Sequence, residues 1–370
     1  MTVADAGPHT GTATSAVPRI APRLLAALSR VTVTRDGTAA NVSGRELTAE
    51  NARDLRGRLT NALYEEFHAG RGAQRDEQGD TAPRRELRDP HLEARLAAGV
   101  PHTRTPFRAR LVEVLHRPDG DQLVVRLPDI TARIPADRLL TEGAPVPGDV
   151  VEVALESARP ALSPGFFYVM GSRALPGPAG PVRRLFLHAV DADGAVALWT
   201  AALDALERAE ALYHAKVLSD PDDFPRRDGL VVYLHGEHER AERAVVEAVR
   251  SLTGNAGTAV AGADTSLFTE RLAPGVAAAW DPRDPRPGQG SMSFGQHRSF
   301  ALATALIDHA LSGETGPDAL EARVVREFRA AGIDPLRPEN NIPAPGPAPG
   351  SGSSPGSAPA PVSASATEGN

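Results

Sequence analysis

The only lysine of this 370-residue chain, Lys216, is the residue whose type most strongly suggests chemistry. The chain has 40 lysine and arginine residues, so arginine supplies nearly every positive charge. Arginine stays protonated in a protein, whereas a desolvated lysine can lose its proton and act as a base or a nucleophile. A position that keeps lysine in this composition is therefore a candidate for chemistry. The alternatives are an accident of an arginine-biased composition, or a charge that protects a strand edge.

Histidine and arginine residues occur in the same α/β-patterned segment as this lysine. His188 is predicted in the middle of a strand, and one helix separates that strand from the strand of the lysine. In a β–α–β unit the two side chains can lie on adjacent strands and face the same side. Arg226 and Arg227 follow in the next loop. His297 and Arg298 begin the last long helix, where backbone N–H groups and the helix dipole attract an anion.

A lysine base, a histidine acid and several arginines suit the removal of a phosphate by β-elimination. The base takes the α-proton of a phosphoserine or phosphothreonine, the acid protonates the departing phosphate, and arginines hold the dianion. This chemistry needs neither a metal nor a cofactor, and we expect none. Taken singly, the strand histidine can also be a hydrogen-bonded core residue, and the arginines can be surface or ion-pair residues.

Composition excludes several other classes of protein. The net charge of −7 argues against nucleic-acid binding, which needs a cationic excess. The absence of cysteine excludes disulfides, thiol catalysis and cysteine-based zinc sites. P-loop, protein-kinase, HExxH and GxSxG motifs are absent, and the spacing of His235 and His238 is too weak to support a metal site. We find no membrane-span pattern and no signal-peptide pattern, and we expect a cytoplasmic protein.

The pattern along the chain predicts an α+β protein with N-terminal helices, a small antiparallel β-rich unit and an α/β unit with a βαβ crossover. Changes in composition divide it into seven segments. They are a disordered arm (1–17), a helical region with a long loop (18–104), a β-rich unit (105–172), a linker (173–182), the α/β domain (183–315), a helical extension (316–337) and a disordered Pro/Ala/Ser-rich tail (338–370).

Hydrophobic periodicity places the individual elements within these segments. A helical pattern runs from 20 to 67, and a short helix is expected near 92–98. The β-rich runs are 107–114, 122–127 and 150–155. In the α/β domain we expect strands at 183–190, 213–218, 229–234 and 276–280, and helices at 194–212, 237–252 and 293–311.

Three motifs resemble the HopA-type effector family, named for a plant-pathogen type III effector. They are AKVLSDPDDFPRRDGLVVYL (215–234), SLFTERLAPGVAAAWDP (266–282) and SFGQHRSFALATALI (293–307), and their order along the chain is fairly specific. The resemblance covers roughly 165–312 clearly and the N-terminal helices loosely. Relatives of this family are widespread in actinobacterial peptide biosynthesis clusters.

The resemblance implies an activity and a set of roles. In class V lanthipeptide and thioamitide pathways, similar proteins act as the lyase that eliminates phosphate from a phosphorylated Ser or Thr to give dehydroalanine or dehydrobutyrine. The implied roles are Lys216 as base, His188 as acid with His297 in reserve and Tyr233 assisting, and Arg226, Arg227, Arg271 and Arg298 as phosphate ligands.

The resemblance also implies partners. These are a phosphorylated precursor peptide with its leader, a separate kinase-like protein and a cyclase. The β-rich unit is a candidate leader-binding surface, since exposed strand edges can pair with an extended peptide. The alternative to a lyase is a non-catalytic peptide-binding or scaffold subunit of a kinase–cyclase complex. Such a subunit would tolerate Lys216→Arg, whereas a lyase would not.

Overall fold

The computed structural model describes residues 19–71, 88–128, 130–160, 162–175, 180–255, 260–287 and 292–343. The predicted disordered arm and most of the predicted disordered tail lie outside these ranges. Residues 338–343 are described, and the backbone N–H of Trp280 donates to the Glu339 carbonyl at 2.9 Å. Residues 338–343 of the predicted tail are therefore part of the fold, because they close against the end of a core strand.

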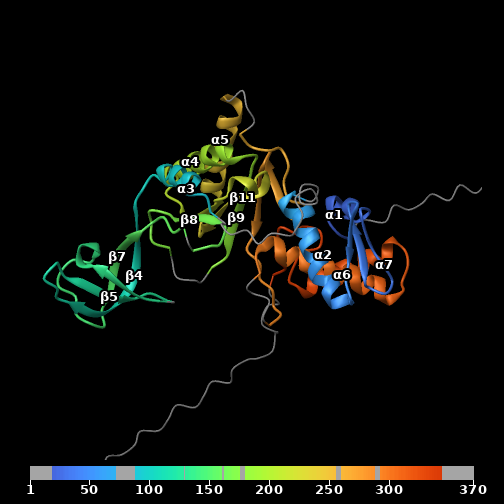
Figure 1. Ribbon diagram of the computed structural model, residues 1–370, viewed down its shortest axis with the longest axis horizontal. Helices are drawn as coiled ribbons and strands as arrows, with labels where there is room; N and C mark the ends of the chain where they lie inside the picture. Colours follow the sequence, from blue (N-terminus) through green and yellow to red (C-terminus); the bar gives the residue numbers. More distant parts are fainter. Residues whose placement is uncertain are drawn as a thin grey trace, which may run out of the picture.

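The described strands form three sheets in which every named pair is antiparallel. Figure 1 shows the four-stranded sheet at one end of the molecule and helices α1, α2, α6 and α7 at the other. The expected α+β class is confirmed. The helical elements are α1 (Pro22–Leu28), α2 (Ala52–Leu63), the π-helical segment η1 (Tyr64–Ala69), α3 (Pro90–Ala98), η2 (Ala136–Arg138), α4 (Ala192–Arg208), η3 (Pro221–Asp223), α5 (Glu239–Asn255), α6 (Phe294–Ser312) and α7 (Pro317–Ala330).

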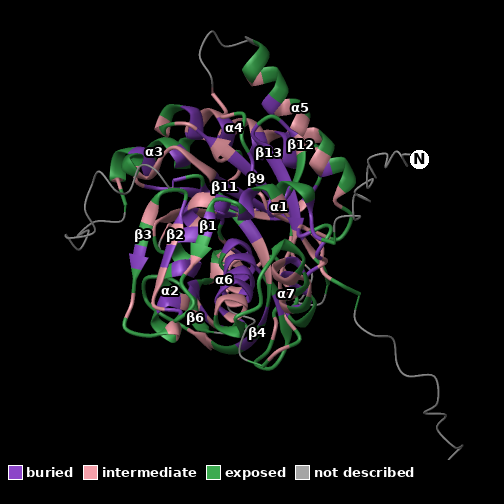
Figure 2. Ribbon diagram, turned by 90° about the vertical axis from the view of Figure 1, so that its right-hand side faces the viewer, coloured by how far each residue is buried: buried purple, intermediate pink, exposed green. Residues whose placement is uncertain are grey.

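The six-stranded sheet is the centre of the fold and has the strand order β12-β13-β9-β11-β10-β8. Its strands are β8 (Phe166–Met170), β9 (Val182–Ala189), β10 (Leu212–Leu218), β11 (Arg226–His235), β12 (Glu270–Ala273) and β13 (Val276–Trp280). Alternation along β9 divides the core: Leu185 and Leu187 pack with α4, whereas Phe186 packs with α6. Helices thus cover both faces, and Figure 2 shows the strands buried between them.

The predicted βαβ unit exists, but its two strands are not neighbours. Helix α4 connects β9 to β10, and β11 lies between them, paired with both. Because β11 is antiparallel to each of them, β9 and β10 run in the same direction, as a crossover requires. The expectation of adjacent strands is wrong because the third strand of the unit enters the gap.

The N-terminal region is not helical throughout. A three-stranded sheet interrupts the predicted helical pattern, with β1 (Val31–Val33), β2 (Ala39–Val42) and β3 (Arg45–Thr48) in sequence order. A tight turn at Ser43 and Gly44, both with positive φ, joins the last two strands. Helix α2 starts after Asn51, whose side chain accepts hydrogen bonds from the N–H groups of Arg53 and Asp54.

The β-rich unit is smaller than predicted. Its sheet has the order β6-β5-β4-β7, with β4 (Arg104–Leu115), β5 (Gln122–Arg126), β6 (Thr131–Pro135) and β7 (Val150–Glu156). Strand β8, predicted as its last part, belongs to the six-stranded sheet instead. The reason is burial, since Phe167 and Val169 pack into the core against α4.

Trp199 on α4 offers a test of this core. Its side chain is fully buried, its indole N–H donates to the Leu96 carbonyl at 3.0 Å, and its ring packs edge-on against Phe167. We expect Trp199→Ala to lower the free energy of unfolding by about 3–5 kcal/mol and the melting temperature by roughly 10 °C. Thermal unfolding followed by circular dichroism measures this. The control Leu311→Ala, at a half-exposed position, should change little; equal losses would contradict the assigned core.

Candidate functional site

Lys216 lies in the middle of β10 on the partly exposed face of the six-stranded sheet. Its strand neighbours Ala215 and Val217 are buried against α4, so the lysine points to the opposite face. In the strand register it lies opposite Tyr168 on one side and Val231 on the other. Its amine lies 4.0 Å from the centre of the Phe166 ring. The sheet thus presents the amine beside aromatic surface rather than in open water.

The surroundings of this amine favour its neutral form. Burial lowers the pKa of Lys216 to about 8; the charges of Arg184 and Arg226 add to the shift and that of Asp228 opposes it. Near neutral pH a measurable fraction of the amine is therefore unprotonated. A neutral amine among cations is the arrangement required of a lysine base that acts on an anionic substrate.

A row of stacked side chains extends from the lysine across the same sheet face. Arg184, Tyr233 and His214 occupy directly opposed positions on β9, β11 and β10. The guanidinium of Arg184 lies 4.8 Å from the Tyr233 ring centre, and the Tyr233 and His214 rings stack at 4.3 Å. Burial lowers the pKa of His214 to about 3, so this ring is neutral. Arg184 also forms an ion pair with Asp281, which fixes its position.

Arg226 is fixed by a buried network at the start of β11. Asp228 accepts hydrogen bonds from Arg226 Nε at 2.8 Å and from Arg226 Nη2 at 2.9 Å. The Tyr64 hydroxyl donates to Asp228 at 2.8 Å and accepts from Arg226 at 2.7 Å. Burial alone would raise the pKa of Asp228, but Arg226 and His68 hold it far below its usual range. The carboxylate is therefore ionised, and the guanidinium is held in one orientation.

The network continues into the π-helical segment η1. His68 is buried, its Nε2 lies 3.6 Å from Asp228, and its Nδ1 lies 2.9 Å from the Ser266 hydroxyl. Burial lowers the pKa of His68 to about 4, so the ring is neutral near pH 7. Rare π-helical turns occur often at functional sites. Here the turn brings Tyr64 and His68 from the N-terminal region to the sheet.

His188 occupies a separate place on the same sheet face. Its Nδ1 lies 3.1 Å from the Asp264 carbonyl oxygen, and burial lowers its pKa. Two strand spacings, about 9.5 Å, separate β9 from β10, so His188 does not adjoin Lys216. Arg227 lies near His188 and donates to the Glu66 carbonyl at 3.1 Å. Among the residues predicted from sequence, Tyr233 lies on the strand next to that of Lys216, and the charge of Arg226 acts on the Lys216 amine. His188 and Arg227 lie further away.

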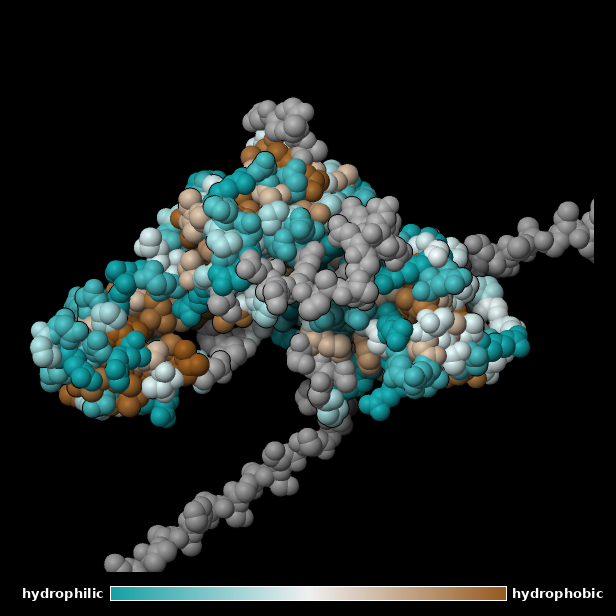
Figure 3. All heavy atoms as spheres, in the orientation of Figure 1, coloured by the Kyte–Doolittle hydropathy of each residue, from teal (hydrophilic) through white to brown (hydrophobic). Residues whose placement is uncertain are grey.

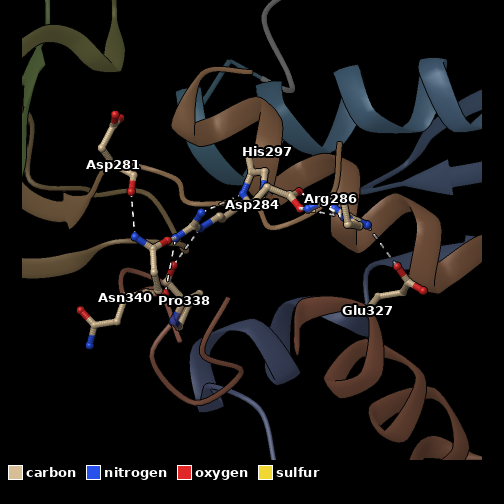
Figure 4. Close-up of polar contacts among 9 residues, drawn as sticks. Asp281, Asp284, Arg286, His297, Glu327, Pro338 and Asn340 are labelled. Atoms are coloured by element: carbon tan, nitrogen blue, oxygen red, sulfur yellow. Dashed lines mark hydrogen bonds and ion pairs between the residues drawn. The ribbon is translucent and has the colours of Figure 1, made fainter. Parts of the chain in front are cut away.

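Figure 4 shows the network of polar contacts around His297, Asp284 and Pro338, and Arg298 bonds to His297 and to the Pro338 carbonyl within it. The His297 and Arg298 side chains are fully buried. His297 bonds to Asp284 at 2.9 Å and to Arg298 at 2.8 Å, and Arg298 donates to the Pro338 carbonyl at 3.0 Å and to the Asn341 side chain at 3.1 Å. The structure therefore corrects the prediction of an open anion site here. These side chains bind the C-terminal segment instead.

The start of α6 is also occupied. The Ser293 hydroxyl accepts from the Gln296 N–H, and the Gln296 side chain accepts from the Ser293 N–H, forming a reciprocal cap. Arg271 lies exposed on β12, and three strands separate β12 from β10. Neither feature is brought to the lysine, so the predicted phosphate ligands Arg298 and Arg271 do not share its site.

Other features of the described chain lie away from the lysine. A groove of about 720 Å³ lies between α4 and α5, on the side of the sheet away from Lys216. Within the described ranges no group of three or more His, Asp or Glu side chains could hold a metal ion. No described helix is long and apolar enough to cross a membrane.

The sequence analysis did not single out Arg184, Asp228, Tyr64, His214 or Tyr168. Asp228 directly follows the predicted ligand Arg227, and alternation along β9 places Arg184 on the face of His188. Tyr64 gave no signal, because its role depends on a contact across 164 positions of sequence.

The single lysine makes a direct titration possible. With lysine labelled selectively by ¹³C, one side-chain NMR signal reports Lys216 alone, and we expect an apparent pKa of about 8 in the folded chain. Arg184→Gln should raise this pKa because it removes a neighbouring positive charge. Asp228→Asn should lower it because it removes a negative one. An ordinary lysine value that neither variant shifts would contradict this electrostatic description, and the unfolded chain supplies the reference.

The part of the chain that contains Lys216, Arg184 and Arg226 is similar to a known protein family. Residues 157–339 match the HopA1 effector protein family. Two solved structures of effector proteins align with 48% of the chain: that from Pseudomonas syringae pv. tomato strain DC3000 at 19% identity and TM-score 0.36, and that from P. syringae pv. syringae strain 61 at 17% identity and TM-score 0.35. The alignment spans 62% of each effector structure. No curated protein matches.

Proposed function

Since residues 157–339 of this chain belong to the HopA1 effector protein family, we propose that the chain is a phosphoserine/phosphothreonine lyase acting on a phosphorylated precursor peptide. The product is a peptide with dehydroalanine or dehydrobutyrine, and a separate kinase-like protein supplies the phosphopeptide. The observation that carries the proposal is the Lys216 amine, which is shifted toward neutrality on a partly exposed sheet face beside the cations Arg184 and Arg226.

The geometry suits an elimination in which the arginines bind the phosphate charge and the lysine removes the α-proton. The phosphate dianion lies between Arg184 and Arg226, whose positions are fixed by Asp281 and Asp228. The Lys216 amine takes the α-proton, the electron pair forms the Cα–Cβ double bond, and the Cβ–O bond breaks with release of phosphate. The arginines stabilise the charge on the departing oxygen. Every atom of the substrate is accounted for in the alkene, the phosphate and the lysine-bound proton.

Tyr233 is better placed than His188 to serve the departing phosphate in this arrangement. Its strand β11 adjoins the strand of Lys216, and its ring contacts Arg184, a phosphate ligand in the proposal. His188 and Arg227 lie further along the face, where they could contact a substrate segment next to the phosphorylated residue. Tyr233→Phe removes the phenolic proton and therefore distinguishes the two candidate acids. A loss of rate would identify Tyr233 as the acid, whereas an unchanged rate would favour His188.

Mass spectrometry of a phosphopeptide incubated with the protein tests the proposal. We expect wild type to release phosphoric acid from the phosphopeptide. Lys216→Arg should reduce the rate of this release about 10²–10⁴-fold, because a guanidinium cannot serve as the base. Arg271→Gln, on the distant edge strand, is the matched control and should keep the wild-type rate. If wild type and Lys216→Arg both leave the phosphopeptide intact, with and without the kinase-like protein, the chain is a binding subunit instead.

The rate should depend on pH through the same lysine. The base acts only when neutral, so kcat/KM should rise as pH increases through the Lys216 pKa of about 8 and become constant above it. Measuring kcat/KM between mildly acidic and alkaline pH checks the direction. A rate that falls across this range would contradict a lysine base.

Replacing the cations should separate binding from proton transfer. Arg226→Gln or Arg184→Gln removes a charge-assisted contact to the phosphate, and we expect kcat/KM to fall about 10–100-fold. The exposed control Arg53→Gln should have no effect. Wild-type kcat/KM in both site variants would place the phosphate elsewhere.

A further inference from the structure

The four-stranded sheet has one buried face and one exposed face. Its buried face forms a small core of its own, made of Ala109, Leu111, Leu123, Val125, Leu127, Ile134, Val151 and Val153. The alternate residues of the same strands point to solvent. No helix of the described chain covers this outer face closely enough to bury it, so its side chains are available to a partner.

Arginine dominates that outer face. Arg108 and Arg110 on β4, Arg126 on β5 and Arg133 on β6 alternate with core residues and are all exposed. Arg110 lies directly opposite Arg126 in the strand register. Like charges at directly opposed positions destabilise a sheet, so this placement does not serve the stability of the unit.

The described chain neutralises the charges on this face only in part. The ion pairs within the unit lie elsewhere, joining Arg138 to Asp137 and Glu156 and His116 to Asp121. Arg110 donates to the Gly148 carbonyl at 2.6 Å, a contact that leaves its charge uncompensated. Glu152 points outward directly opposite Arg108 in the strand register, and Glu113 also points outward, but no ion pair joins either glutamate to these arginines among the described residues. The face therefore has a cationic excess in a chain of net charge −7.

Exposed apolar side chains lie close to these arginines. Val150 is 53% exposed opposite Arg110, and Val112 is 39% exposed at the bulge of β4. Figure 3 shows hydrophobic and hydrophilic residues mixed on the surface of this unit. The combination fits a polypeptide better than a nucleic acid or a lipid surface, which would favour a larger and more uniform positive field.

We propose that this face binds an acidic, extended segment of the precursor peptide, which rests on the proposed function. In an extended strand, acidic side chains at every second position point to one side about 7 Å apart, the spacing at which Arg108 and Arg110 point outward. The charges are complementary, and the valines accept the apolar parts of the peptide. The surface is an anchor that is distinct from the phosphate site.

The structure also connects this anchor to Lys216. Strand β7 continues into Ser157 and Arg159, which exchange backbone hydrogen bonds with β8 around Tyr168. Tyr168 lies opposite Lys216 in the register. The path from Val150 to Arg159 is about 30 Å long at the rise of an extended chain, which sets an upper limit on the separation of its ends. An extended peptide of about ten residues is therefore long enough to span this part of the route from the sheet toward the lysine.

Binding of a defined probe tests the anchor without any chemistry. The probe is a fluorescent, unphosphorylated peptide of alternating Glu and Ser, compared by anisotropy with the same peptide in which Gln replaces Glu. We expect wild type to bind only the Glu peptide and Arg110→Gln/Arg126→Gln to bind it about tenfold more weakly. Arg53→Gln/Arg250→Gln removes two exposed arginines elsewhere and should bind as wild type does. Circular dichroism confirms that the variants remain folded.

Several outcomes would overturn the anchor. They are no binding of the Glu peptide, equal binding of the Gln peptide, unchanged binding in Arg110→Gln/Arg126→Gln, or stronger binding of duplex DNA or phosphatidylserine vesicles at the same arginines. Lys216→Arg should bind the probe as wild type does. The binding result can therefore be interpreted even if the lyase proposal fails. If the lyase proposal holds, Arg110→Gln/Arg126→Gln should process a short phosphopeptide at the wild-type rate. An attached acidic segment should increase the rate of wild type but not that of this variant.

Discussion

The buried ion pair between Arg226 and Asp228 is the contact on which the candidate site depends. Asp228 is 8% exposed, and an ionised carboxylate at such depth is tolerated only with close partners. Arg226, Tyr64 and His68 supply them, and they come from the sheet and from the N-terminal π-helical turn. The same contacts that compensate the carboxylate orient the guanidinium and add a positive potential beside Lys216. Stability and the proposed chemistry therefore rest on the same few atoms.

Much of the sheet could be predicted from local pattern, but its assembly could not. The strand of Lys216 and the strand at 276–280 were predicted within one residue, because short apolar runs between turn signals are visible in the sequence. The insertion of β11 between β9 and β10 depends on pairing between distant strands, which periodicity does not encode. That insertion is why His188 and Lys216, predicted on neighbouring strands, are separated. The three short N-terminal strands were missed because they lie between two helices with strong apolar stripes.

The motif that contains His297 and Arg298 illustrates a different limit. Residue type alone suggested an anion-binding site, since a histidine and an arginine at a helix start can bind an anion. Burial excludes this role: Arg298 is fully enclosed, and its donors are used by His297 and by the backbone and side chains of residues 338–341. In such a position an arginine acts as a clamp for a chain segment rather than as a ligand. The distinction between the two roles appears only when the accessibility of the guanidinium is known.

The proposed site draws its side chains from positions far apart in the chain, and this has a consequence for biosynthesis on the ribosome. Tyr64 must meet Asp228, and Arg184 must meet Asp281. Contacts of such large sequence separation raise the contact order and slow folding. The N-terminal segment that contains Tyr64 is translated long before its partners emerge from the exit tunnel. The environment of Lys216 is therefore completed only after the chain has been released beyond Asp281, which pairs with Arg184.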